Sequence, residues 1–300
     1  MEIIEILEGS ILGDGSIKSK DGKYFTFQIS GKDNRFLEWT AKFLNMSGIN
    51  CWISKSNPNL FSLGFYINSC PYKNLLSWRK EWYATENNKL VKTFPSDLKI
   101  TPLVLLFWYL GDGCLVRRRN DENRVPTIVL ATNCFSKDDI IILIEKLREL
   151  RLNFYPVEYT SGFTGKKSGY CLYSNTEDGT PLRFFQLIGL ECPEEIENYS
   201  TGTKGIYHEE KFFKDKWPRE EDWIKILSNV GGVNKIIGKK REELNLSKRK
   251  LAKLIGISRE HFRDFELGKH KVSVKNFRKI LEALNLDANY LLVSLNQSNN

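Results

Sequence analysis

A four-residue motif, Leu-Gly-Asp-Gly, occurs twice in this chain and constrains the fold more than any other feature. The copies are Leu12-Gly13-Asp14-Gly15 and Leu110-Gly111-Asp112-Gly113, and each closes an apolar run with helical spacing. A single Gly-Asp-Gly is most often a turn. Two copies, each followed by the same succession of patterns, indicate a duplicated body whose motif helices meet at a pseudo-twofold axis.

The patterns that follow each motif agree between the two copies. Each copy has a β-rich segment (24–30 and 127–132), then an amphipathic helix (33–44 and 136–150). Further strands come next (51–54 with 61–67, and 154–159 with 170–173), and a short helix closes each copy (75–83 and 182–188). The fold class predicted is α+β, with two pseudo-symmetric αββαββα units that share a central two-helix interface.

The net charge of +8 is concentrated in one part of the chain. Residues 235–275 hold thirteen Lys or Arg against five Asp or Glu, so the remaining residues sum to zero. A basic module on a neutral body favours a phosphate-bearing partner, although a solvated helical surface is the alternative. The charged segment near Trp217-Pro218 and the Gly231-Gly232 pair place the boundary of this module near residue 230.

The motif residues resemble those of the LAGLIDADG homing endonucleases in their monomeric, two-motif form. The matching runs are Leu7-Glu8-Gly9-Ser10-Ile11-Leu12-Gly13-Asp14-Gly15 and Leu105-Leu106-Phe107-Trp108-Tyr109-Leu110-Gly111-Asp112-Gly113. The resemblance covers roughly residues 1–215 and implies that Asp14 and Asp112 face the scissile phosphates. The second run has Phe107-Trp108-Tyr109 where the first has Gly9-Ser10-Ile11, so we expect an asymmetric helix contact.

The chemistry of phosphodiester cleavage is consistent with a catalytic role for Asp14 and Asp112. It needs an activated water and charge stabilisation, which a divalent cation supplies. Mg²⁺ or Mn²⁺ prefers carboxylate and carbonyl oxygens, so Asp14, Asp112 and the carbonyls of Gly13 and Gly111 are candidate metal ligands. Three scattered histidines and six cysteines without a CxxC pair argue against zinc, and no GxxxxGK[ST] motif indicates a nucleotide cofactor.

The resemblance also implies supporting catalytic residues. A basic residue near each scissile site would be Lys92 in the first copy and Lys204 in the second, and Gln28 would face the active-site water, with Leu130 in the equivalent place of the second copy. For each of these, an ordinary surface lysine or a strand polar group is an equally good interpretation. Basic residues after each motif fit a DNA-reading β surface, with solvated loop charge as the alternative. They are Lys18, Lys20, Lys23, Arg117, Arg118, Arg119 and Arg124.

Residues 239–293 resemble a Cro/repressor-type helix-turn-helix domain, a small all-α unit. Ser247 and Ser258 would cap the second helix and the recognition helix, Gly256 would make the tight turn, and Gly268 would end the recognition helix. The resemblance implies an Arg241–Glu266 ion pair beneath the DNA-facing surface. The candidate DNA contacts are Lys248, Arg249, Lys250, Ser258, Arg259, Glu260, His261 and Arg263. A helical tail that binds protein is the alternative.

The sequence therefore predicts a site-specific, metal-dependent double-strand DNA endonuclease of the homing type, associated with intron or intein mobility. A non-cleaving DNA-binding regulator or a splicing maturase on the same fold is the alternative. The predicted domains are 1–95, 96–215, a linker at 216–234, and the helix-turn-helix domain at 235–300. We expect a monomer in the cytoplasm or an organellar matrix, without a secretory signal or a membrane partner.

Overall fold

The computed structural model describes residues 2–19, 25–31, 33–46, 48–55, 65–70, 75–86, 88–118, 121, 123–160, 167–204 and 210–298. The chain forms two compact units. The first comprises residues 1–115, 128–173 and 185–217, and the second comprises 116–127, 174–184 and 218–300.

The first half of the duplicated body has the predicted order of elements. It contains helices α1 (Glu2–Leu12), α2 (Asn34–Met46) and α3 (Leu75–Trp82), and strands β1 (Gly15–Ser19), β2 (Phe25–Gly31), β3 (Cys51–Lys55) and β4 (Phe65–Ser69). The strands form an antiparallel sheet in the order β1-β2-β4-β3, and α2 contacts β2, β3 and β4.

The second half repeats this arrangement. It contains helices α4 (Pro102–Asp112), α5 (Lys137–Glu149) and α6 (Thr180–Ile188), and strands β7 (Gly113–Val116), β8 (Thr127–Ala131), β9 (Phe154–Thr160) and β10 (Lys167–Ser174). The sheet order is β7-β8-β10-β9, which matches the first sheet strand for strand. The predicted αββαββα duplication is confirmed.

Local sequence signals account for these elements. Thr101 accepts a hydrogen bond from the Val104 amide at the start of α4, and Pro102 occupies the first turn, where it costs no hydrogen bond. Ser136 and Asp139 form a reciprocal capping box at the start of α5. In β2, side chains alternate between buried and more exposed positions, as expected for a sheet with one face on the core.

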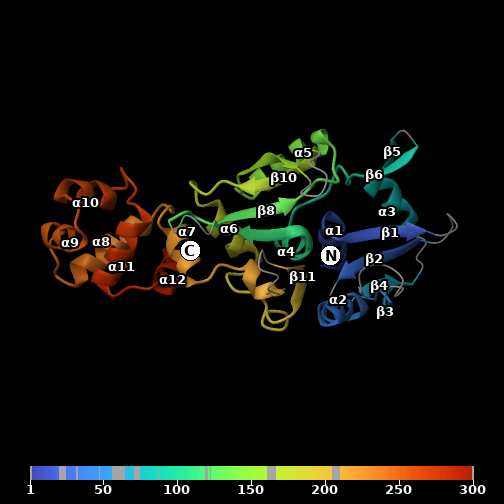
Figure 1. The fold of residues 1–300 in the computed structure, drawn as a ribbon, viewed down its shortest axis with the longest axis horizontal. Helices are drawn as coiled ribbons and strands as arrows, with labels where there is room; N and C mark the ends of the chain where they lie inside the picture. The colour runs from blue at the N-terminus through green and yellow to red at the C-terminus, as the bar shows by residue number, and fades with distance from the viewer. Residues whose placement is uncertain are drawn as a thin grey trace. The chain divides into compact units, whose positions relative to one another are not determined.

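The two motif helices pack directly against each other (Figure 1). A Cβ atom added at Gly9 would lie 2.4 Å from the Val104 carbonyl oxygen and 2.9 Å from Phe107 Cβ, so only glycine allows this approach. The contact is asymmetric, as expected. The ring of Phe107 on α4 stacks on Trp39 of α2, and that of Tyr109 meets Phe185 and Trp217 edge-on.

Two hairpins were not predicted from the sequence. The first pairs β5 (Tyr83–Glu86) with β6 (Lys89–Lys92), just before α4. The second pairs β11 (Ser200–Lys204) with β12 (Glu210–Phe212), and the 3₁₀ turn η1 (Phe213–Lys216) follows it. Each hairpin therefore closes one half of the body.

The second unit contains six helices among its described residues. They are α7 (Glu220–Leu227), α8 (Val233–Glu243), α9 (Lys248–Ile255), α10 (Arg259–Glu266), α11 (Val274–Leu284) and α12 (Ala288–Ser298). Helix α7 lies within the predicted linker 216–234, and it buries Trp223, Ile226 and Leu227 while contacting α11 and α12. In the part of the chain that the structure describes, no helix has the length and apolar character to cross a membrane.

Candidate active site and nucleic-acid interface

The two motif aspartates follow the closest approach of α1 and α4. A Cβ atom added at Gly111 would lie 3.1 Å from the Asp14 amide nitrogen, and one added at Gly13 would lie 3.4 Å from the Asp112 amide nitrogen. The main chains of the two motifs are therefore in contact where the acids begin. Asp14 is exposed and Asp112 is half-buried, so both halves contribute one carboxylate to the same region.

A lysine holds the carbonyl groups at the end of the first motif helix. Lys92, the last residue of β6, donates from Nζ to the carbonyl oxygen of Gly13 at 2.9 Å and to that of Gly15 at 3.4 Å. The carbonyls at a helix C-terminus lack partners within the helix and carry partial negative charge, which an ammonium group satisfies. Lys92, predicted from the sequence, thus lies directly beside the first acid motif.

Lys216 plays the same part at the second motif helix. Its Nζ donates to the carbonyl oxygens of Tyr109 at 3.1 Å, Leu110 at 2.6 Å and Gly111 at 3.2 Å. The neighbouring Trp217 is buried and donates from Nε1 to the Gly189 carbonyl at 3.0 Å, which anchors the end of η1. Each half therefore supplies one aspartate and one lysine.

Lys216 thus lies beside the second motif, where the resemblance implied Lys204. Lys204 is the last residue of β11, and its side chain lies outside the described residues. The extra turn η1 moves the second-copy lysine beyond the hairpin, whereas Lys92 lies at the end of its own hairpin. A sequence signal for Lys216 exists: Lys216-Trp217-Pro218 parallels Lys92-Thr93-Phe94-Pro95, with a buried aromatic residue and a proline after each lysine.

The four groups influence one another electrostatically. Desolvation, and then the charge of Asp14, raises the pKa of Asp112 to about 7, while Lys92 and Lys216 pull it down. Desolvation also raises the pKa of Asp14, against the effect of the two lysines. Burial lowers the pKa of Lys92, and it lowers the pKa of Lys216 to about 8. The negative charge of Asp14 thus opposes ionisation of Asp112, as a nearby like charge does.

The donor set fits a hard divalent cation. Among the described residues, no three His, Cys, Asp or Glu side chains gather into a group that could hold a metal ion. The groups at the helix ends that could hold such a cation are the carboxylates of Asp14 and Asp112 and nearby main-chain carbonyls, with water and phosphate completing the shell. The Gly13 and Gly111 carbonyls already accept from lysines, but a carbonyl oxygen has a second lone pair.

Gln28 lies in a polar row on the exposed side of the first sheet. Its Nε2 donates to Asn68 Oδ1 at 2.8 Å, and Asn68 donates from Nδ2 to Ser54 Oγ at 2.7 Å. The strand register also places Gln28 opposite Ser16 on β1. In the second half, Leu130 on β8 is fully buried opposite Leu172, so the two sheets differ at this point.

The predicted DNA-facing basic residues of the body differ in their surroundings. Lys18 on β1, Arg118 and Arg124 are exposed. Arg117 instead forms an ion pair with the buried Asp222 of α7, with 2.7 Å between Nε and Oδ2. Lys20, Lys23 and Arg119 lie outside the described residues.

The helix-turn-helix signals are confirmed in α9 and α10. Ser247 accepts from the Lys250 amide, Ser258 accepts from the His261 amide, and both serines cap their helices. Gly256 has a φ of +80° at the tight turn, and Gly268 has a φ of +71° after the recognition helix, conformations that favour glycine. Phe262 and Phe265 of α10 are buried against the rest of the module.

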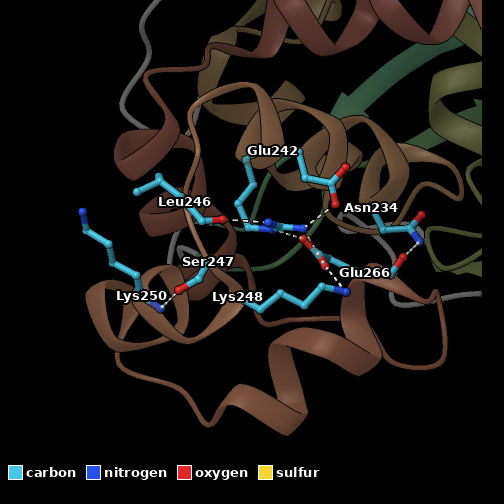
Figure 2. Close-up of polar contacts among 8 residues, drawn as sticks. Asn234, Glu242, Leu246, Ser247, Lys248, Lys250 and Glu266 are labelled. Atoms are coloured by element: carbon cyan, nitrogen blue, oxygen red, sulfur yellow. Dashed lines mark hydrogen bonds and ion pairs between the residues drawn. The ribbon is translucent and has the colours of Figure 1, made fainter.

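A buried ion-pair network lies beneath α9 and α10 (Figure 2). Arg241 Nε lies 2.6 Å from Glu266 Oε1, and each of these side chains is 6% exposed. Arg241 also donates to the Leu246 carbonyl at 2.7 Å, and Asn234 donates to the Glu266 carbonyl at 2.8 Å. The Arg241–Glu266 pair that the resemblance implies is therefore present.

Lys248, one of the residues predicted to contact DNA, belongs to the same ion-pair network. Lys248 Nζ lies 2.8 Å from Glu266 Oε2, and the lysine side chain is 37% exposed. Ser258 caps α10, whereas six other candidates have exposed side chains on the first turn of α9 or on α10. These six are Arg249, Lys250, Arg259, Glu260, His261 and Arg263.

The fold and site define a duplicated α+β protein that presents one aspartate and one lysine per half at the ends of paired helices. The model of the LAGLIDADG DNA endonuclease family matches residues 4–182, more than half of the chain, and a helix-turn-helix model matches residues 237–291. The chain belongs to the LAGLIDADG DNA endonuclease family.

Individual relatives are distant. An uncharacterised protein of Methanocaldococcus jannaschii is 28% identical over 149 residues, 48% of this chain and 54% of that protein. The cytochrome b mRNA maturase bI2 of Debaryomyces hansenii is 26% identical over 192 residues, 60% of this chain and 67% of that protein. This chain thus spans between half and two thirds of the length of these relatives.

Two solved structures also resemble this chain, with low sequence identity. The homing endonuclease I-WcaI, bound to its DNA recognition sequence, is 23% identical with a TM-score of 0.47, covering 63% of this chain and 81% of that one. The meganuclease I-AabMI, bound to uncleaved DNA, is 13% identical with a TM-score of 0.39, covering 88% of this chain and 98% of that one.

Proposed function

We propose that this chain is a site-specific endonuclease that cuts both strands of a DNA duplex with Mg²⁺ or Mn²⁺. The observation that carries the proposal is that each half supplies one aspartate and one lysine at the ends of two helices in contact. These are Asp14 and Lys92 from the first half, and Asp112 and Lys216 from the second. Cutting two strands requires two such sets, and the duplication supplies them.

In this proposal the carboxylates of Asp14 and Asp112, with the Gly13 and Gly111 carbonyls, would hold the cation. When bound, it would supply charge stabilisation at the phosphate and would activate a water. Lys92 and Lys216 fix the carbonyl groups at the helix ends and place positive charge beside the phosphate.

The other predicted residues have subsidiary roles in the proposal. Gln28, in its row with Asn68, faces water or a base edge from the sheet surface. Lys18, Arg118 and Arg124, with Lys20, Lys23 and Arg119, contact the DNA backbone. The helix-turn-helix domain adds affinity through α10, since a linked module raises the effective concentration of the second contact. We propose that the protein acts as a monomer, because both half-sites lie in one chain.

Cleavage of a plasmid library tests the proposal. Purified protein with Mg²⁺ should linearise only plasmids that carry a small set of related sequences, and EDTA should stop the reaction. Cutting that continues in EDTA, or equal nicking of every plasmid, would contradict a metal-dependent and site-specific enzyme.

One observation favours a second function. The yeast relatives are named as cytochrome b mRNA maturases, so assistance of RNA splicing is the alternative use of this fold. Competition binding separates the two. An endonuclease should prefer duplex DNA over structured intron RNA at equal salt, whereas a maturase should show the reverse preference.

A further inference from the structure

Arg117, one of the arginines predicted to face DNA, is tied to a buried acid within the second unit. Its Nε lies 2.7 Å from Asp222 Oδ2; the Asp222 side chain is 5% exposed and that of Arg117 is 28% exposed. The same Oδ2 also accepts the Arg219 amide at 3.1 Å, at the start of α7. A buried carboxylate is costly without a partner, so this geometry holds Arg117 in place.

Other contacts join the remaining parts of the second unit. Lys271 Nζ donates to the Glu177 carbonyl at 2.6 Å, and Asn229 Nδ2 donates to the Thr176 carbonyl at 3.2 Å. Arg278 of α11 pairs with Glu221 of α7 at 2.8 Å. Segments 116–127 and 174–184, which lie between strands of the body in sequence, are thus bonded to the helices at the C-terminus.

This arrangement gathers two sets of exposed cations into one compact unit. Arg118 and Arg124 belong to segment 116–127, and Arg259 and Arg263 belong to α10. Exposed guanidinium groups are suited to bind phosphates, and two sets held on one folded unit would bind a duplex with less loss of conformational freedom than two sets on flexible chain.

We propose that Arg117 is a positioning residue that holds segment 116–127 on α7, so that this segment and the helix-turn-helix bind one DNA duplex as a single module. The inference rests on the proposed DNA-binding function. It differs from the sequence expectation in one respect: Arg117 acts through Asp222 and does not contact phosphate, while its neighbour Arg118 does.

Four single variants of the full chain and one double variant test the proposal. Arg117→Met and Asp222→Asn remove the two partners of the ion pair, Arg117→Lys keeps the charge, and Arg118→Met is the charge-matched control on the adjacent residue. Two measurements are made on each variant: amide hydrogen exchange without DNA, and the salt dependence of binding to a fluorescein-labelled duplex of mixed sequence in EDTA. Each lost phosphate contact lowers the salt slope by about 0.9, so the slope separates contact from positioning.

The ion pair predicts a distinct pattern. Arg117→Met and Asp222→Asn should speed exchange in segment 116–127 and the first turn of α7 to the same extent, and should weaken binding about threefold to tenfold at an unchanged salt slope. Their double variant should be no worse than either single variant. Arg117→Lys should restore most of the affinity, and Arg118→Met should lower the slope while leaving exchange unchanged.

Other results overturn the proposal in separable ways. A lower salt slope in Arg117→Met, with normal exchange in Asp222→Asn, would make Arg117 a direct phosphate contact. Faster exchange in both ion-pair variants with no loss of DNA affinity would show that the pair only stabilises the fold. It would contradict the proposal that segment 116–127 and the helix-turn-helix bind DNA as a single module. A wild-type protein that fails to bind the duplex would overturn the proposed function and the shared module, whatever the exchange data show.

Discussion

At the scale of single residues, the two lysines differ in how far the sequence could place them. Lys92 could be placed because the family resemblance implies a basic residue just before the second motif helix. Lys216 could not be placed by counting, because η1 adds a turn after β12 that the first half lacks. What both lysines share is physical: each satisfies helix-end carbonyls, and a buried aromatic residue follows it.

The lysines give the first prediction. Lys92→Met and Lys216→Met should each lower the rate of DNA cleavage about a hundredfold, the usual loss when one preorganised donor is removed from a charged transition state. Lys204→Met should keep near wild-type activity. Single-turnover cleavage with Mg²⁺ checks this, and a slow Lys204→Met variant beside a normal Lys216→Met variant would restore the original assignment.

Glu8, on α1, gives a prediction about pH. Desolvation, with the charges of Asp97 and Glu5, raises its pKa from 4.5 to about 7. The folded protein therefore holds this proton more tightly than the unfolded chain. Stability contributed by Glu8 is greatest below about pH 4.5 and is lost as pH rises toward 7.

The variant Glu8→Gln should therefore be more stable than wild type at pH 8, by about 1 kcal/mol once solvent screening of a half-buried group is allowed for, and the gain should shrink at pH 5. Denaturant unfolding at both pH values measures it. Glu145→Gln, on the exposed side of α5, is the matched control for the same substitution at a solvated glutamate. An equal gain at both pH values would exclude a proton as the cause.

At the scale of elements, the helices and sheets of the body followed from local sequence signals. Caps such as Ser136 and alternating strands such as β2 are encoded within a few residues, so their positions were predictable. The β5–β6 and β11–β12 hairpins were not, because their strands have only three to five residues and no clear alternation. Their formation depends on tertiary contacts that the sequence does not display.

The α1–α4 contact gives the third prediction. Gly9→Ala would place a Cβ atom 2.4 Å from the Val104 carbonyl oxygen, so the helices must separate. We expect a loss of about 1–3 kcal/mol in the free energy of unfolding of the body, with slower DNA cleavage because the aspartates shift. Gly231→Ala, where an added Cβ meets no atom within 4 Å, should change neither. Equal stability of the two variants would contradict the close contact.

The helix-turn-helix gives the fourth prediction. Glu266→Ala strands the guanidinium of Arg241, which is 6% exposed, and should destabilise α8–α10 by about 3–5 kcal/mol. Glu243→Ala removes an ion pair with Lys240 in which the glutamate is 46% exposed, so it should cost less than about 1 kcal/mol. Hydrogen exchange across residues 233–268 measures both effects, and equal protection in the two variants would contradict a buried network.

At the scale of the whole molecule, the sequence indicated which modules exist but not how the chain is shared between them. The charge excess and capping serines located the helix-turn-helix. The second unit nevertheless includes segments 116–127 and 174–184 from the middle of the chain. These segments join the second unit through contacts between residues far apart in sequence, for example Arg117 with Asp222 and Lys271 with Glu177. No local sequence pattern predicts such contacts. The predicted boundaries at 95, 215 and 234 stay predictions.

The central claim is that Asp14 and Asp112 together allow this chain to cut both strands of DNA. The most direct measurement compares wild type, Asp14→Asn and Asp112→Asn in cleavage of the selected plasmid with Mg²⁺, alongside duplex binding in EDTA. Each variant should lose double-strand cutting, because its half of the site lacks the carboxylate, while folding and DNA binding remain close to wild type. Full double-strand cutting by both single variants would contradict the account.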